Sequence, residues 1–117
     1  MKSFFVIVML FFSMTAFSQT PSCTTLMQYV QNNGSNFSSL YSYTLNSSWL
    51  DEVNAYNIDG NIAVIASIKR EGEYMSKKYV FCGISQSSWS SFTSSWGSDT
   101  YGERFNKYIM DSLCNCR

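Results

Sequence analysis

The chain has 117 residues, of which 45% are hydrophobic, and its eight Lys and Arg residues balance eight Asp and Glu residues. The formal charge of zero argues against the basic surface that nucleic-acid-binding proteins use. Histidine is absent, which excludes the usual base that activates serine or cysteine nucleophiles. No phosphate loop or metal-ligand motif occurs either, so no cofactor is expected.

The N-terminus is typical of a secretory signal peptide. Lys2 gives a short basic start, residues 4–12 are an uninterrupted apolar run, and Ala16 and Ser18 fit a signal-peptidase site. The run is shorter than the roughly 20 residues of a membrane-spanning helix. We therefore expect residues 1–18 to be removed by cleavage after Ser18, leaving a secreted or periplasmic protein without a transmembrane segment.

Four cysteines follow this segment: Cys23, Cys82, Cys114 and Cys116. In an oxidising compartment an even number of cysteines indicates disulfides. We expect Cys82 to bond one member of the Cys114/Cys116 pair and Cys23 the other, with the choice left open. A redox bond within the pair is disfavoured because its ring is small and strained. A lipid anchor on Cys23 is disfavoured because the preceding Thr-Pro-Ser lacks apolar and small residues.

The first part of the mature chain predicts a helix and a loop. Apolar residues recur at three- and four-residue spacing between Pro21, which suits a helix start, and Gly34, which suits a stop. Residues 35–48 are rich in Ser, Asn and Tyr without a steady period, which indicates a surface loop. Residues 19–46 are thus expected to form an N-terminal helix and a Ser/Tyr-rich loop.

Three strands are predicted next. Asp59-Gly60 separates the β-rich runs 53–58 and 62–68, a strong hairpin signal because both residues tolerate positive φ. Ile62, Val64, Ala66 and Ile68 share one face of the second strand. After a charged turn at residues 69–76, Lys77–Cys82 forms the third strand. Tyr79 and Phe81 point to one side of it and Val80 and Cys82 to the other. The spacing from Val53 to Tyr56 suggests a bulge in the first strand.

Two amphipathic helices are predicted at the C-terminus. The first is capped by Ser87 or Ser88 and places aromatic residues at three- and four-residue intervals, ending at Gly97. The second begins at Thr100, which forms a capping box with Glu103. The buried residues expected are Trp89, Phe92 and Trp96 in the first helix and Phe105, Tyr108, Ile109 and Leu113 in the second. The fold class predicted is α+β: a three-stranded antiparallel meander covered on one face by two C-terminal helices, with an extra N-terminal helix.

Several of these segments together resemble the KTSC domain. The resemblance rests on Ser47-Ser48, on the third strand Tyr79-Val-Phe-Cys-Gly83, and on the ending Gly102-Glu-Arg-Phe-Asn-Lys-Tyr-Ile109. KTSC domains are small, occur alone in bacterial proteins and at the C-terminus of some lysyl-tRNA synthetases, and have been suggested to bind RNA. The resemblance therefore implies a KTSC-like domain over residues 47–117, although export would separate it from tRNA.

The chain departs from the family pattern at several positions. Phe81 replaces the second residue of the usual tyrosine pair, Gly83-Ile-Ser replaces the usual Gly-Val-Pro, and the turn at residues 71–76 is longer. The four cysteines and the N-terminal helix are not features of the synthetase-attached form. These departures weaken the transfer of an RNA-binding role.

The candidate binding residues are aromatic, amide and basic side chains. Tyr41 and Tyr43 lie in a segment with the composition of adaptable binding loops. Tyr79 suits stacking on a ligand, but we favour a core position for it beneath the helices. For Asn106 we favour a hydrogen bond to a neighbouring loop such as Ser47-Ser48 over a ligand contact. Arg104 and Lys107 are placed with Asn106 on one helical surface that is either an interface or solvated.

The leading hypothesis is an exported, non-catalytic KTSC-like module that binds an unidentified protein or glycan. The first alternative is the RNA-binding role suggested for the family, which the neutral charge and export make less favourable. The second alternative is a small enzyme that uses carboxylates and tyrosines, with Asp51, Glu103 and Tyr79 as the residues to test.

Overall fold

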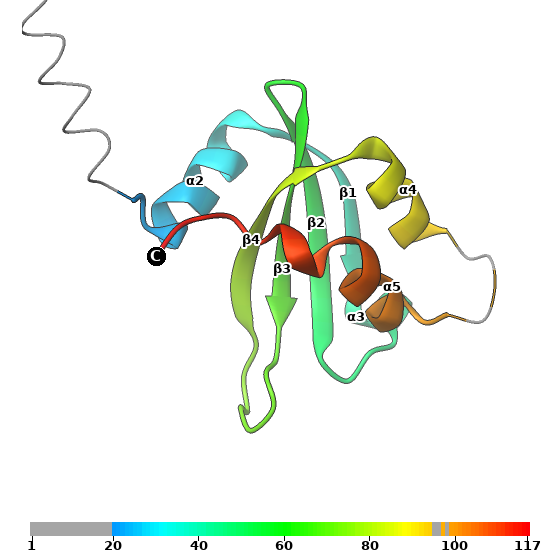
Figure 1. Cartoon of the computed structure of the whole chain (residues 1–117). Helices are drawn as coiled ribbons and strands as arrows, with labels where there is room; N and C mark the ends of the chain where they lie inside the picture. Colours follow the sequence, from blue (N-terminus) through cyan, green and yellow to red (C-terminus); the bar gives the residue numbers. More distant parts are fainter. Residues whose placement is uncertain (1–19, 95–96, 98) are drawn as a thin grey trace, which may run out of the picture.

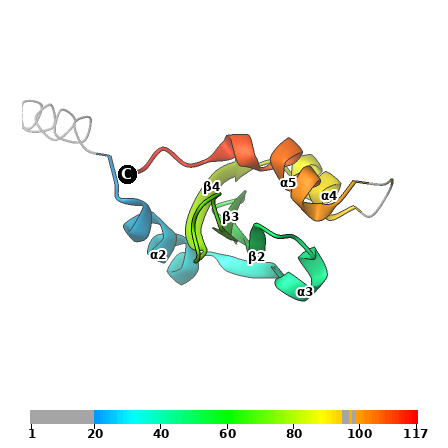
Figure 2. The ribbon, with the colours of Figure 1, turned by 90° about the horizontal axis from the view of Figure 1, so that it is seen from below.

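A computed structural model of the chain describes residues 20–94, 97 and 99–117, so the expected signal peptide and Trp96 lie outside the described residues. A four-stranded antiparallel sheet with the order β1-β2-β3-β4 carries helices on both faces (Figures 1 and 2). The α+β class is confirmed. The elements are α2 (Cys23–Asn33), β1 (Ser35–Tyr41), α3 (Ser42–Leu45), β2 (Leu50–Ile58), β3 (Asn61–Ile68), β4 (Lys77–Ile84), α4 (Gln86–Thr93), α5 (Tyr101–Tyr108) and the 3₁₀ helix η1 (Met110–Ser112).

Strand β1 corrects the prediction of three strands, because it occupies the segment expected to be a loop. It pairs with β2 from Ser35 opposite Asn57 to Tyr41 opposite Glu52. The pairing is interrupted between Asn36 and Ser38, where the Asn36 amide donates to the Ala55 carbonyl at 3.1 Å. None of the β1 side chains is fully buried. An edge strand of this kind forms through backbone hydrogen bonds and leaves no alternating apolar pattern in the sequence.

The hairpin and the faces of β3 are confirmed. Asp59 and Gly60 have φ values of 52° and 81°, as a turn of this type requires. Ile62, Val64, Ala66 and Ile68 all belong to the core on one side of the sheet. The bulge expected between Val53 and Tyr56 is wrong: the β2–β3 register is regular there and shifts between Leu50 and Glu52.

Helices cover both faces of the sheet, whereas the sequence predicted one covered face and an unplaced N-terminal helix. On one face α4 and α5 bury Trp89, Phe92 and Phe105 against β2, β3 and β4. On the other face α2 packs its buried Val30 with Ala63, Ile65 and Val80. Both sets of alternating residues in β3 are therefore inside the protein.

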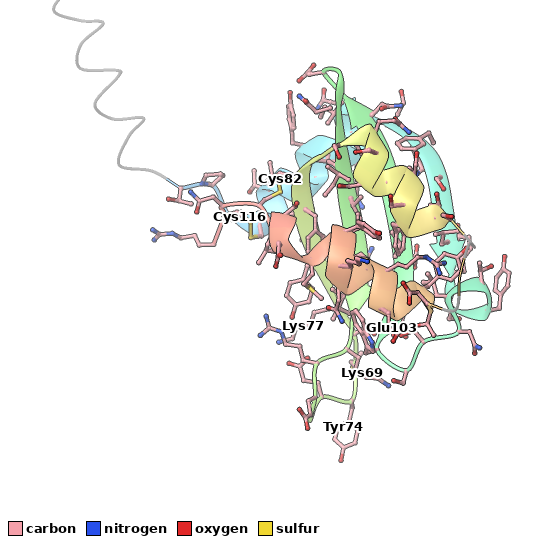
Figure 3. The ribbon with its side chains drawn as sticks, turned by 45° about the vertical axis from the view of Figure 1, so that its right-hand side comes forward. Lys69, Tyr74, Lys77, Cys82, Glu103 and Cys116 are labelled. Atoms are coloured by element: carbon pink, nitrogen blue, oxygen red, sulfur yellow. A yellow bond between two sulfur atoms is a disulfide. The ribbon has the colours of Figure 1, made fainter. Side chains whose placement is uncertain are left out.

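Two disulfides connect the C-terminal segment to the rest of the fold. Cys23 bonds Cys116 and Cys82 bonds Cys114, which confirms the predicted pattern and resolves the choice between the two members of the pair (Figure 3). Next to them the two ends of the domain pair through their backbones: the Cys23 N–H donates to the Arg117 carbonyl at 2.7 Å. The first disulfide thus links α2 to the C-terminal segment, and the second links that segment to β4.

The C-terminal helices differ from the prediction in their ends. The N-cap of α4 is Ser85, not Ser87 or Ser88, and its hydroxyl accepts from the Ser88 N–H at 3.0 Å. The capping box of Thr100 and Glu103 is confirmed. Leu113 lies beyond α5 and is 54% exposed, so its placement in the buried helical stripe was wrong. The chain turns through η1 and brings Leu113 into an isolated bridge with Phe81. Among the described residues, no helix has the length and hydropathy of a membrane span.

Candidate functional site

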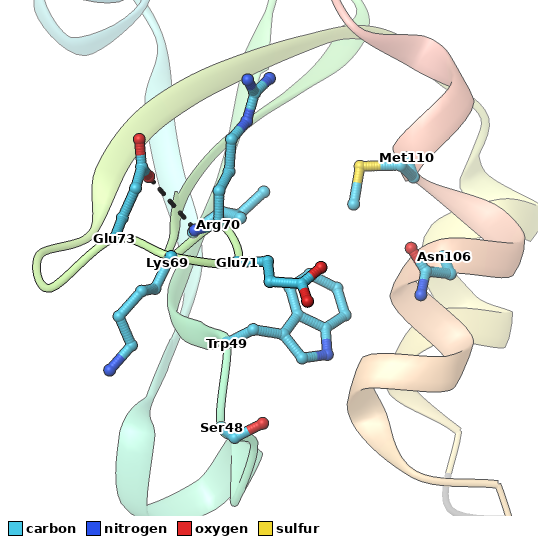
Figure 4. A pocket seen from close by; sticks show the side chains of 10 residues that line it. Ser48, Trp49, Lys69, Arg70, Glu71, Glu73, Asn106 and Met110 are labelled. Carbon is cyan, nitrogen blue, oxygen red and sulfur yellow. Dashed lines mark hydrogen bonds between the residues drawn. The ribbon is translucent and has the colours of Figure 1, made fainter.

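An open groove lies between the β3–β4 turn and helix α5 (Figure 4). Its volume is about 770 Å³, and the indole of Trp49 lies between the two walls. We call it the Trp49 groove. Its lining residues come from three separate segments of the chain: Ser48, Trp49, Ile68, Lys69, Arg70, Glu71, Gly72, Glu73, Asn106 and Met110.

Trp49 is fixed by hydrogen bonds from its own backbone. Its N–H donates to the Ser47 hydroxyl at 3.2 Å, and its carbonyl accepts from the Lys69 N–H at 2.8 Å. The ring contacts Phe105 edge to face, with centroids 6.0 Å apart, so one side of the half-buried indole joins the core. Preorganised aromatic surface of this kind is well suited to binding, because little side-chain entropy remains to be lost.

Gly102 allows α5 to approach Trp49 closely. A Cβ atom at this buried position would lie 3.1 Å from the Trp49 Nε1 atom and 3.4 Å from the Ser47 hydroxyl oxygen. A larger residue would push the helix and the indole apart. The glycine therefore helps to set the position of the indole relative to the helical wall.

The wall formed by the β3–β4 turn contains equal numbers of cations and anions. Lys69 and Arg70 offset Glu71 and Glu73, so the lining has a formal charge of two minus two, or zero. The Glu73 carboxylate accepts from the Arg70 N–H at 3.3 Å and forms an ion pair with Lys77 at 3.5 Å. Glu71 also belongs to this wall, and its side chain extends from the turn into the groove (Figure 4). This wall offers hydrogen-bond donors and acceptors without a net charge.

On the opposite wall Asn106 points toward the groove (Figure 4). The predicted hydrogen bond to the Ser47-Ser48 loop is wrong: within the described chain the exposed Asn106 amide has no hydrogen-bond partner. The Ser47 hydroxyl instead accepts from the N–H groups of Trp49 and Leu50. Both the donor and the acceptor of the Asn106 amide are thus available to a ligand. Lys107 is also exposed but is not among the lining residues, and its ammonium lies 5.4 Å from the Tyr108 ring centroid.

Tyr79 takes the core position that we favoured. It is half-buried and packs against the same core that contains Phe81, while the Arg70 guanidinium lies 5.2 Å from its ring centroid. Tyr79 lines a smaller cavity of about 150 Å³ that shares Ile68, Arg70 and Met110 with the Trp49 groove. Tyr79 is therefore available to a ligand at one end of the Trp49 groove, and not on an open sheet face.

Arg104 is not on a solvated surface with Asn106 and Lys107, which corrects the prediction. Only 6% of the residue is exposed. Its Nε donates to the Phe92 carbonyl at 2.8 Å and its Nη1 to the Asp99 carbonyl at 2.5 Å. Residues two positions apart on a helix do not face the same way, so Arg104 faces the α4–α5 connection while Asn106 faces the groove.

Tyr41 and Tyr43 form a separate exposed surface. They are 45% and 83% exposed, and their rings stack with centroids 6.1 Å apart and planes at 17°. Neither lines the Trp49 groove. The Ser/Tyr-rich segment thus provides an aromatic patch at the end of β1 and on α3. The sequence analysis missed the groove formed by Trp49 and the β3–β4 turn.

The carboxylates named for an enzymatic role have structural partners. The Asp51 carboxylate accepts a hydrogen bond from Ser76. The pKa of Glu103 is lowered, first by the hydrogen bond from the Thr100 N–H and then by the Thr100 hydroxyl. Neither residue lines the groove. In the described ranges, no group of three or more Cys, Asp or Glu side chains is arranged to hold a metal ion.

Comparison of the chain with family models, with curated proteins and with solved structures finds no match. The resemblance to the KTSC domain stays a prediction. The groove is therefore interpreted from its own geometry.

Proposed function

We propose that this chain is an exported, non-catalytic KTSC-like module that binds a glycan in the Trp49 groove. The observation that carries the proposal is the combination of an indole with two walls that offer hydrogen-bonding groups and no net charge. A neutral ligand rich in hydroxyl groups complements such a lining. A charged ligand would be repelled by the groups of like charge in the β3–β4 turn, which are Lys69 and Arg70 for a cation and Glu71 and Glu73 for an anion.

Each part of the groove has a role in this proposal. The indole of Trp49 offers an apolar surface for the C–H face of a sugar ring, a contact that buries area without a charged partner. The Glu71 carboxylate accepts hydrogen bonds from sugar hydroxyls, while the Asn106 amide both donates and accepts. The open shape of the groove favours a polymer that passes through it over a small molecule that is enclosed.

Two disulfides support the exported part of the proposal, since disulfides persist in oxidising compartments. The RNA-binding alternative is less favourable at this groove because Glu71 and Glu73 would repel phosphates. The enzymatic alternative lacks support because Asp51 and Glu103 are outside the groove and already hydrogen-bonded.

The proposal is tested by calorimetric titration of the oxidised protein, produced by export of the full chain. The probes are hexamers of glucose and of N-acetylglucosamine, with a neutral decapeptide and a single-stranded RNA decamer for comparison. We expect binding of at least one hexamer and weaker binding of the peptide and RNA. Binding of the peptide or RNA alone would contradict the proposal, as would the absence of binding to both hexamers.

Variants locate the site. Trp49→Ala is expected to weaken hexamer binding by about tenfold, and Asn106→Ala by about fivefold, because each removes a direct contact. Tyr43→Ala is the matched control, since it removes an exposed aromatic ring outside the groove. An equal loss from Tyr43→Ala would assign the site to the tyrosine pair instead.

A further inference from the structure

The N-terminal end of α5 contains a buried cation without an acidic partner. Arg104 is 6% exposed, and its guanidinium has five N–H donors, of which two have carbonyl partners. In the part of the chain that the structure describes, no carboxylate lies within ion-pair distance of it. A buried charge is costly unless it is compensated by a partner. Among the described residues no fully buried side-chain nitrogen or oxygen lacks a hydrogen-bond partner, so the guanidinium nitrogen without one keeps some accessible surface.

Part of that compensation comes from backbone and aromatic groups. The Phe92 carbonyl is near the C-terminus of α4, where the helix dipole is negative. The Tyr101 ring lies below the guanidinium, with 4.5 Å between Cζ and the ring centroid. These contacts explain how Arg104 is held in place. They leave three of its N–H donors without a partner among the described residues.

A second cavity, of about 250 Å³, adjoins this guanidinium. Arg104 lines it together with Tyr101 and Thr100 from the start of α5 and with Thr44 and Asn46 from the α3 end. The Thr100 hydroxyl is engaged in the capping box, whereas the side chains of Thr44 and Asn46 are exposed and have no hydrogen-bond partner on the described chain. The cavity therefore combines the Arg104 cation, neutral donors and the positive end of a helix dipole, and the exposed Asp99 adds one anion to its lining.

We propose that this cavity is a binding site for a carboxylate group. The guanidinium N–H groups that have no carbonyl partner suit the oxygens of a carboxylate, and Thr44 and Asn46 supply further neutral donors in the lining. The lining has a formal charge of one minus one, and of these two charges only that of Arg104 is buried. A singly charged carboxylate therefore fits better than a phosphate dianion. Asp99 also lines the cavity, but it faces Arg104 with its carbonyl, and its exposed position allows solvent to screen its side chain.

The site is distinct from the Trp49 groove. Asn106, which lines the groove, and Arg104 project from different sides of α5. The proposal therefore does not depend on glycan binding in the groove. Two sources of a carboxylate are an acidic sugar and the C-terminus of a peptide, and the same experiment separates them.

The experiment follows the Arg104 Nε–H signal and the backbone amides of residues 99–102 by NMR. The oxidised, exported protein is titrated with acetate, glucuronate and an N-acetylated dipeptide with a free C-terminus, with chloride and phosphate added at matched ionic strength. We expect saturable shifts with acetate and tighter binding of either glucuronate or the dipeptide, which names the source. Shifts that follow ionic strength alone, or tighter binding of phosphate than of any carboxylate, would overturn the proposal.

Variants must separate binding from folding because Arg104 also holds the α4–α5 connection. Arg104→Lys keeps the charge and loses the fork, and is expected to weaken carboxylate binding by about tenfold. Asn46→Gly suits the left-handed backbone at this position (φ 48°) and leaves the Arg104 contacts intact, with an expected loss of about threefold. Lys107→Gln on the exposed side of α5 is the matched control and should change binding by less than about twofold. A loss from Lys107→Gln as large as that from Asn46→Gly would show non-specific attraction and contradict a built site.

Discussion

On the sheet face that carries α4 and α5, three fully buried phenylalanines pack edge to face: Phe105 lies 5.3 Å from Phe81 and 5.6 Å from Phe92. On the face that carries α2, the buried side chains are smaller, with Val30 as the single buried residue of the helix. Both disulfides are on this second face or at its edge. The comparison shows that covalent links supplement the face where apolar packing is weakest, as is common in small exported domains.

The largest effect is expected from truncating the aromatic core. Phe105→Ala should lower the free energy of unfolding by about 3–5 kcal/mol, since it removes a fully buried ring that contacts Phe81, Phe92 and Trp49. Val30→Ala on the other face should cost about 1–2 kcal/mol because it removes less apolar surface. Urea denaturation of the oxidised proteins measures both values. Equal losses would contradict the difference between the two faces.

Removing one disulfide should be the next largest effect. Cys23→Ser with Cys116→Ser should lower the free energy of unfolding by about 2–4 kcal/mol and increase hydrogen exchange in α2. The Cys82–Cys114 bridge closes a shorter loop, with a sequence separation of 32 instead of 93. In the chain-entropy description, removing the Cys82–Cys114 bridge should lower the free energy of unfolding by about 1 kcal/mol less than removing the Cys23–Cys116 bridge. Increased hydrogen exchange in α5 instead of α2 would show that the Cys23–Cys116 bridge stabilises the face covered by α4 and α5. That result would contradict the assignment of the disulfides to the α2 face.

A smaller effect is expected where α5 approaches the groove. Gly102→Ala should destabilise the fold by about 1–2 kcal/mol, because the new methyl group would lie 3.1 Å from the Trp49 ring. It should also shift the tryptophan fluorescence and weaken ligand binding in the groove. Gly97→Ala is unsuitable as a control because its φ is positive. Ser90→Ala on the exposed side of α4 is better, and an equal fluorescence change there would contradict a specific contact.

The smallest effect concerns the capping box. The pKa of Glu103 is lowered by hydrogen bonds from Thr100, so the ionised form is favoured in the folded state. Its contribution to stability is present above its ordinary pKa of 4.5 and is lost as the pH falls through the lower folded-state value. Glu103→Gln should therefore flatten the stability profile below about pH 4.5. Denaturation at pH 3 and pH 7 measures this change, and Glu71→Gln in the β3–β4 turn serves as the control.

Local patterns in the sequence determined much of the fold. The Asp59-Gly60 turn, the Thr100–Glu103 capping box and the two-residue alternation of β3 each depend on residues close together in the chain. The even number of cysteines and the short spacing of Cys114 and Cys116 were enough to predict two disulfides that each use one member of this pair, but not which member bonds Cys23. These features were predicted because their physical cause is local backbone geometry or the redox chemistry of a compartment.

Other features depended on the tertiary structure. Strand β1 has no apolar alternation and exists because β2 offers it backbone partners. The burial of Arg104 depends on carbonyls that α4 and the following connection present to it. The Trp49 groove brings together three distant segments, and no single segment contains the pattern of a site. Sequence alone determined the local elements and the sulfur chemistry. The packing of those elements decided which polar groups remain available to a ligand, because burial and hydrogen-bond satisfaction are properties of the assembled fold.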